Sequence, residues 1–236
     1  MKRVPTAELL DTDSGTPQEI AQSLADLRQI NRRFGGVSTT QAMIEHVAGV
    51  VQARSLSLLE VAAGAGDTPH LVQQALRARG IHLEVTLLDR AATHLNHRRP
   101  GNGLPAVAAD ALELPFRDGS FDLVGCNLFV HHLSPDEVVR FAGEALRVSR
   151  AAALINDLVR SPLHLALVYA GMPLYHSRIT RHDAVASIRQ AYTPDEMRAM
   201  LAQAGAAEIE IFRHFLFRMG IVAWKHVQSH RENVAH

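Results

Sequence analysis

Three histidines are the side chains of this sequence best suited to take a proton from a bound molecule. His131 and His132 are adjacent, and His182 precedes Asp183, whose carboxylate can orient an imidazole. A histidine acts as a general base only within hydrogen-bond reach of the proton that it removes. A catalytic role for each of the three therefore depends on its position. The alternative interpretation is that His131 and His132 pack inside the fold and that His182 lies on the exposed face of a helix.

A second group of residues with chemical potential lies in the stretch LLEVAAGAGDTPH, from Leu58 to His70. Gly64 and Gly66 let backbone N–H groups approach a ligand closely, because no Cβ is in the way. Pro69 occupies the third small position of a dinucleotide fingerprint, and Asp67 places negative charge where a pyrophosphate would lie. The stretch therefore disfavours a dinucleotide and favours a ligand with an amino group and a cationic centre.

The elements that must position these residues alternate between strands and helices. Apolar runs predict strands at residues 56–62, 81–89, 106–109, 121–130 and 151–158. Helices are expected at residues 16–36, 40–53, 69–80, 134–149 and 193–205, with a short one from Ala91. Three of them begin with a capping box, at Thr16, Ser134 and Thr193. Strands separated by helices imply a parallel, doubly wound sheet.

The end of the chain breaks this alternation. The runs at residues 207–215 and 217–226 have too little sequence between them for a crossover helix, so we expect an antiparallel hairpin at the sheet edge. We expect an N-terminal helical segment over residues 1–54, a main domain over 55–226 and a polar tail over 227–236. Residues 159–192 form a long connection, which we interpret as an inserted lid. Its apolar run, Leu163 to Tyr175, has three alternative interpretations. It could line an acceptor pocket, pack the lid against the domain, or contact a second copy of the chain.

Composition excludes several classes of partner. Lys and Arg (24) balance Asp and Glu (24), so we expect no nucleic acid and no anionic membrane as a partner. The 14 histidines are dispersed without a metal-binding spacing, so no metal is expected. Cys126 is the single cysteine, and no signal peptide or apolar run of membrane-spanning length is present, which favours the cytoplasm. Monomer and homodimer remain open.

The glycine-containing stretch resembles the first motif of class I S-adenosylmethionine-dependent methyltransferases, an acid followed by three alternating glycines. Glu60 stands at the acid, Gly64 and Gly66 at two of the glycines, and Ala62 departs from the pattern at the first glycine. The resemblance spans residues 40–225. It implies an S-adenosyl-L-methionine cofactor, with S-adenosyl-L-homocysteine as product. It also implies a Rossmann-like α/β fold with helices on both faces of a seven-stranded sheet. The sheet is mostly parallel, its strand order is 3-2-1-4-5-7-6, and its last strand is antiparallel.

The later motifs of that family follow in order and imply more cofactor-binding residues. These are Asp89, with Arg90 beside it, for the ribose hydroxyls, Asp110 and Ala111 for the adenine, and Asn127 and Leu128 for the methionine part. A carboxylate suits the ribose position because it accepts hydrogen bonds from two hydroxyls.

The resemblance implies direct displacement of a methyl group onto a hydroxyl or carbon of a small aromatic or polyketide-like acceptor. The chain is similar to bacterial polyketide-tailoring methyltransferases and to those of ubiquinone and menaquinone biosynthesis. Asn156 and Asp157, at the end of the fifth strand, bind the acceptor or cap the next helix. The alternative function is a regulatory or assembly protein that retains the cofactor site without catalysis.

Overall fold

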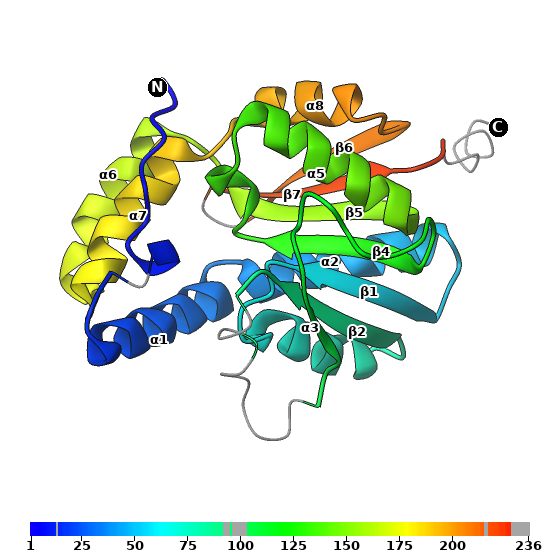
Figure 1. The fold of residues 1–236 in the computed structure, drawn as a ribbon, viewed down its shortest axis with the longest axis horizontal. Helices are drawn as coiled ribbons and strands as arrows, with labels where there is room; N and C mark the ends of the chain where they lie inside the picture. Colours follow the sequence, from blue (N-terminus) through cyan, green and yellow to red (C-terminus); the bar gives the residue numbers. More distant parts are fainter. Residues whose placement is uncertain (13, 92–94, 96–102, 215–216, 228–236) are drawn as a thin grey trace.

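The sheet has the strand order β3-β2-β1-β4-β5-β7-β6, as the resemblance predicts. The computed structural model describes residues 1–12, 14–91, 95, 103–214 and 217–227 (Figure 1). Its strands are β1 (Ser55–Val61), β2 (His82–Asp89), β3 (Ala106–Ala108), β4 (Phe121–Asn127), β5 (Ser149–Leu158), β6 (Glu208–His214) and β7 (Arg218–Trp224).

The expected terminal hairpin is confirmed. β6 and β7 pair antiparallel, and β7 also pairs antiparallel with β5, while the pairs that β1 to β5 form among themselves are all parallel. Seven residues of β7 are buried, because the strand lies between two neighbours. The carboxyl ends of β1, β2, β4 and β5 therefore share one edge of the sheet.

Helices cover both faces of the sheet. They are α1 (Pro17–Arg33), α2 (Gly36–Val50), α3 (Asp67–Arg77), α5 (Pro135–Val148), α6 (Pro162–Gly171), α7 (Arg178–Gln190) and α8 (Pro194–Gln203), with short 3-10 turns η1 (Leu10–Thr12), η2 (Val130–His132) and η3 (Met172–Leu174). One apolar core joins the sheet to α5 and α8, and the other joins it to α2 and α3.

The elements outside these layers gather beyond one end of the sheet. Figure 1 shows α1, α6, α7 and the start of the chain together on the left, where β5 runs into α6. α7 packs against both α1 and α6. This group stands opposite the carboxyl ends of the parallel strands, where ligands bind in open α/β sheets.

The three predicted capping boxes are present at Thr16, Ser134 and Thr193. The predicted start of the second helix at Thr40 is wrong, since α2 begins at Gly36. Gly35 adopts a left-handed conformation (φ 86°) that turns the chain at once from α1 into α2. Gly36 is required there because an added Cβ would collide with Asn31.

The predicted fourth strand also ends differently. β4 stops at Asn127 rather than at Val130, because Leu128 takes a left-handed conformation (φ 54°) and leads the chain into η2. The short helix expected from Ala91 and the tail expected beyond Val227 lie outside the described residues. Among the helices that the structure describes, none combines the length and apolarity needed to cross a bilayer.

Candidate active site

A cavity of about 1110 Å³ lies between the carboxyl edge of the sheet and the group of helices beyond it. Its floor comes from the ends of β1 and β4, and its other walls include α1, α3, α6, α7 and the N-terminal segment (residues 1–12). Seven of the predicted site residues line it: Glu60, Ala62, Gly64, Asn127, Leu128, His131 and His132.

Glu60 is a buried acid in the cavity wall. It lies near the end of β1, its side chain is only 2% exposed, and Oε2 has no hydrogen-bond partner among the described residues. Burial raises the pKa of this carboxyl to about 8. A buried carboxylate without a partner is costly, so Glu60 is suited to a ligand that brings a cation or a hydrogen-bond donor.

The loop after β1 exposes its backbone to the cavity. Ala62, Gly64 and Gly66 all have left-handed backbones, with φ of 53°, 54° and 73°. A Cβ added at Gly64 would meet no atom of the described residues within 4 Å, so the glycine leaves open space beside the loop. Ala62 adopts a conformation that usually requires glycine, which explains why the family motif has a glycine there.

Asp89 holds this loop against the end of β2. Its Oδ2 accepts a hydrogen bond from Gly64 N–H at 2.8 Å, and its Oδ1 accepts one from Ala91 N–H at 2.9 Å. A carboxylate retains further acceptor capacity after two such bonds. Asp89 is buried and does not itself line the cavity in this structure.

Arg218 joins the floor of the cavity to α1. The buried guanidinium donates hydrogen bonds to the side-chain oxygens of Asn127 at 2.9 Å, Asn156 at 3.0 Å and Asn31 at 3.0 Å. Burial lowers the pKa of Arg218 to about 10, although Asp157 opposes the shift. Asn156, fully buried, also donates to Gly36 O. Asn156 is thus engaged in positioning α2.

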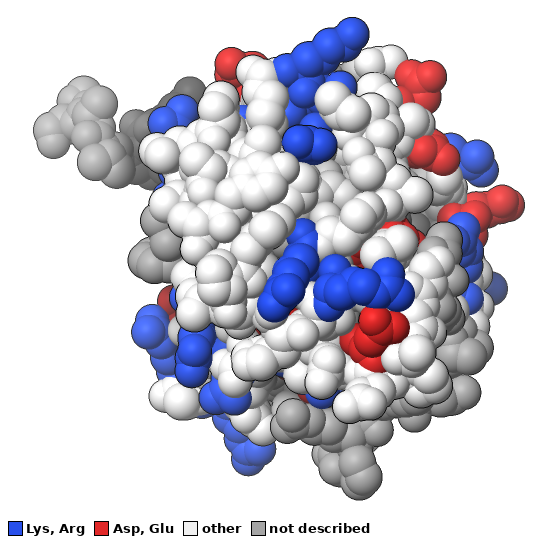
Figure 2. Space-filling view, turned by 90° about the vertical axis from the view of Figure 1, so that its left-hand side faces the viewer, with Lys and Arg blue, Asp and Glu red and all other residues white. Residues whose placement is uncertain are grey.

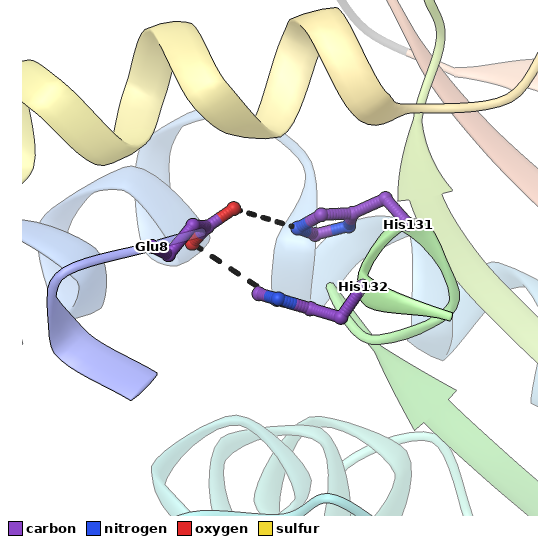
Figure 3. Close-up of side chains that lie close together, drawn as sticks. All are labelled: Glu8, His131 and His132. Carbon is purple, nitrogen blue, oxygen red and sulfur yellow. Dashed lines mark ion pairs between the residues drawn. The ribbon is translucent and has the colours of Figure 1, made fainter. Parts of the chain in front are cut away.

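His131 is held between two carboxylates. Its Nδ1 lies 2.7 Å from Asp157 Oδ1, and its Nε2 lies 3.4 Å from Glu8 Oε1 (Figure 3). Burial alone would lower the pKa of His131, but Asp157 and Glu8 outweigh it and raise the pKa to about 10. A proton held this firmly makes His131 a poor general base in the state described here.

His132 faces the same carboxylate from the next position. Its Nε2 lies 4.0 Å from Glu8 Oε2, and its Nδ1 lies 2.9 Å from Asp11 Oδ2. Its ring is tilted against that of His131, with centroids 4.2 Å apart. Figure 3 shows both rings directed from η2 toward Glu8.

Other predicted site residues do not line the cavity. Gly66 is buried at the N-cap of α3, and Asp110 uses Oδ1 to accept from Leu112 N–H at 2.8 Å. His182 is exposed and pairs with Asp183 at 2.8 Å, whose carboxylate also accepts from the backbone of residues 9 and 10. The remaining members of this set are Asp89, Arg90 and Ala111.

The apolar run of residues 163–175 divides between the cavity and the surface. Leu167, Val168, Pro173 and Leu174 contribute to the cavity lining, whereas Leu163 does not line it and is 60% exposed. Figure 2 shows the face on which α6 and α7 lie, where broad uncharged areas separate small groups of Lys, Arg, Asp and Glu.

Sequence reasoning missed Glu8, Asp11 and Arg218 as site residues. Glu8 reaches η2 because Leu9 and Leu10 donate backbone hydrogen bonds to Asp183, and because its own Oε1 accepts from Ser187 and Gln190. These contacts join segments that are about 180 positions apart, and no local pattern reports them. The adjacent histidines were the one signal in the sequence that pointed to this region.

The comparison with family models matches part of the chain. Residues 59–155 match the model described as a methyltransferase domain. No curated protein sequence matches the chain significantly.

Solved structures extend this likeness to the fold. The plantazolicin methyltransferase BpumL, solved with a monoazolic desmethylPZN analogue and SAH, aligns with a TM-score of 0.69 at 12% identity, covering 92% of this chain and 91% of that one. Human N-acetylserotonin methyltransferase, solved with SAM, aligns with a TM-score of 0.55 at 15% identity. The alignment covers 72% of this chain and 48% of the human enzyme, so this chain spans about half the length of that protein. A SAM-dependent methyltransferase from Aquifex aeolicus aligns with a TM-score of 0.52 at 19% identity. The alignment covers 72% of this chain and 81% of that one.

Proposed function

The chain carries a methyltransferase domain of the class I, S-adenosylmethionine-dependent family, and we propose that it transfers the methyl group of this cofactor to an oxygen or carbon of a small, largely apolar acceptor. The observation that carries the proposal is Glu60, a buried carboxyl group whose Oε2 lacks a partner in the described part of the chain and lies in the wall of a cavity large enough for two ligands.

The residues at the carboxyl edge of the sheet fit the cofactor. Glu60 offers a buried carboxyl that can give up its proton when the cationic amino group of the cofactor lies beside it, and the open space beside Gly64 leaves room for close backbone approach. Asp89 holds the loop and retains acceptor capacity for ribose hydroxyls. Asn127 and Leu128, which line the cavity, lie where the methionine part would be held.

The bound cofactor supplies an electrophilic methyl group on a sulfonium, so the protein's contribution is to position the acceptor and to manage its proton. His131 and His132 stand at the acceptor side of the cavity, at the carboxyl end of β4. His182 contributes nothing to the cavity lining, so we do not assign it a role on the acceptor.

The apolar cavity wall supports an apolar or aromatic acceptor. Leu167, Val168 and Phe217 line the cavity beside His164. We propose that residues 159–192 act as a lid that excludes water, since α6 and α7 close the side of the cavity away from the sheet. A cavity of about 1110 Å³ favours catalysis over the alternative of a non-catalytic cofactor-binding protein.

Two measurements test the proposal. Calorimetry with S-adenosyl-L-homocysteine should give saturable binding, and methyl-labelled S-adenosyl-L-methionine should pass its label to phenolic acceptors only in the presence of the protein. The variant Glu60→Ala should lose both. Tight cofactor binding without transfer to any member of a broad phenol and polyketide panel would refute the acceptor class, and absence of cofactor binding by folded protein would refute the whole proposal.

A further inference from the structure

Two histidines and one carboxylate converge at the acceptor side of the cavity. The three potential ligand atoms, one from each of Glu8, His131 and His132, lie within 4.8 Å of one another (Figure 3). The Nε2 atoms of the two imidazoles are 3.4 and 4.0 Å from the Glu8 oxygens, longer than N–H···O hydrogen bonds of about 2.7–3.2 Å. The space between them is suited to an ion rather than to a direct hydrogen bond.

We propose that Glu8, His131 and His132 bind one divalent first-row transition metal ion. Imidazole nitrogen with a carboxylate oxygen is the ligand set such ions prefer, and two histidines with one carboxylate leave coordination positions open. Metal bonds to these atoms are about 2.0–2.2 Å long, which places neighbouring ligand atoms roughly 3–3.5 Å apart. The observed separations need only a small closing movement.

The partners of the three side chains match those of metal ligands. A metal-bound histidine usually donates its other ring N–H to a carboxylate, which fixes the ring. Both histidines do so here, His131 to Asp157 at 2.7 Å and His132 to Asp11 at 2.9 Å. Each ring therefore presents Nε2 to the common point.

The Glu8 carboxylate is positioned in the same way. Its Oε1 accepts hydrogen bonds from Ser187 Oγ at 2.6 Å and from Gln190 Nε2 at 2.8 Å. Bound carboxylates in metal sites are themselves hydrogen-bonded, and this prevents Glu8 from rotating away. The other carboxylate oxygen, Glu8 Oε2, faces His132 Nε2.

Charge also favours a cation at this point. Glu8, Asp11 and Asp157 surround the two imidazoles, and these three carboxylates outnumber the positive charges that the two histidines can carry. The nearby guanidinium of Arg3 donates instead to the backbone oxygens of His131 and Leu133. A divalent ion would offset most of the excess charge.

The location gives the ion a function that rests on the proposed methyl transfer. Glu8, His131 and His132 all line the cavity, so the open coordination positions face the acceptor. An acceptor hydroxyl bound there would lose its proton to water more readily, because a metal lowers the pKa of a coordinated oxygen. The acceptor is then held by an oxygen atom beside the cofactor site.

Metal binding is measured on protein that has been treated with a chelator and then titrated with Co²⁺ or Zn²⁺ alone. We expect one equivalent to bind, with visible Co²⁺ absorption bands from nitrogen ligation. Glu8→Gln and His132→Ala should each weaken binding by at least 10-fold, and Asp157→Asn by roughly 10–100-fold. The matched control is His82→Ala, because His82 forms an exposed pair with Glu84 at 3.7 Å and should bind no less metal after substitution.

Circular dichroism and S-adenosyl-L-homocysteine binding on the same samples separate the outcomes. Cofactor binding without metal binding would overturn the metal site and leave the proposed function standing. Metal binding that survives both Glu8→Gln and His132→Ala would place the ion elsewhere and would also overturn the site. If a variant fails to fold, nitrogen ligation measured on wild-type protein by Co²⁺ absorption decides the question, and absence of those bands refutes the proposal.

Discussion

Asp157 Oδ1 lies 2.7 Å from His131 Nδ1, and this buried contact ties η2 to the end of β5. Asp157 also accepts from the backbone N–H groups of His131 and Leu158, at 3.2 and 2.7 Å. One carboxylate thereby fixes both the position and the ring orientation of the histidine that faces Glu8.

Asp157→Asn should therefore destabilise the metal-free protein strongly. Removing one member of a buried charged pair costs about 3–5 kcal/mol, because the other is left without compensation. Urea denaturation measures the loss. The double variant Asp157→Asn with His131→Gln should lose less than the sum of the single variants, and strict additivity would show that the two side chains do not stabilise one another.

Glu60→Gln should change how stability depends on pH. Burial raises the pKa of Glu60 from 4.5 to about 8, so the folded state favours the neutral acid. The stabilisation of the neutral form is fully present below pH 4.5 and is lost as pH rises through about 8. In cofactor-free protein at pH 8 or above, the variant should be more stable by a few kcal/mol.

The same substitution should weaken cofactor binding, since a charged hydrogen bond of about 1.5–3 kcal/mol is lost. Thermal denaturation across pH and calorimetry with S-adenosyl-L-homocysteine give the two readouts. Equal pH dependence in wild type and Glu60→Gln would show that Glu60 is not a buried titrating acid.

Asp89→Ala should weaken cofactor binding by about 1–3 kcal/mol, because it removes an acceptor for the ribose and releases the Gly64 N–H. Asp89→Asn is the matched comparison: one amide oxygen can still accept from Gly64, but a second acceptor oxygen is gone. Calorimetry with S-adenosyl-L-homocysteine should give the highest affinity for the wild type, a lower one for Asp89→Asn and the lowest for Asp89→Ala. Unchanged affinity in Asp89→Ala would contradict the assignment.

Ala62→Gly should stabilise the protein by about 0.5–1 kcal/mol. A non-glycine residue in the left-handed region costs about 1–2 kcal/mol, and glycine removes this cost while it increases the entropy of the unfolded chain. Ala63→Gly is the control, because Ala63 is not among the residues with positive φ and should gain nothing. A higher melting temperature in both variants, or in neither, would argue against strain at Ala62.

The sequence predicted the sheet because its signals are local. Capping boxes at Thr16, Ser134 and Thr193 and the apolar strand runs each depend on neighbouring residues, so most of the helices and strands were predictable, whereas the strand order came from the family resemblance. Glu60 and Gly64 were found through a motif of the same short kind. Their assigned roles stay predictions until binding is measured.

Contacts between distant segments were not predictable. Glu8 is held toward His131 by hydrogen bonds to α7, and Arg218 reaches Asn127 across the sheet. The start of α2 at Gly36 depends on packing against Asn31, which a periodic pattern does not report. His182 seemed equivalent to the other histidines in sequence, yet the structure leaves it exposed and outside the cavity wall.

The hydrogen bond from Arg218 to Asn31 joins residues 187 positions apart, and this has a consequence for synthesis of the protein. While the ribosome is still translating the segment before β7, the motif-bearing strands can already assemble, but Arg218 is not yet available to Asn31 of α1. The nascent chain would therefore form the carboxyl edge of the sheet before Arg218 joins that edge to α1. Closure then waits for contacts of very long sequence separation, which form slowly compared with local helices.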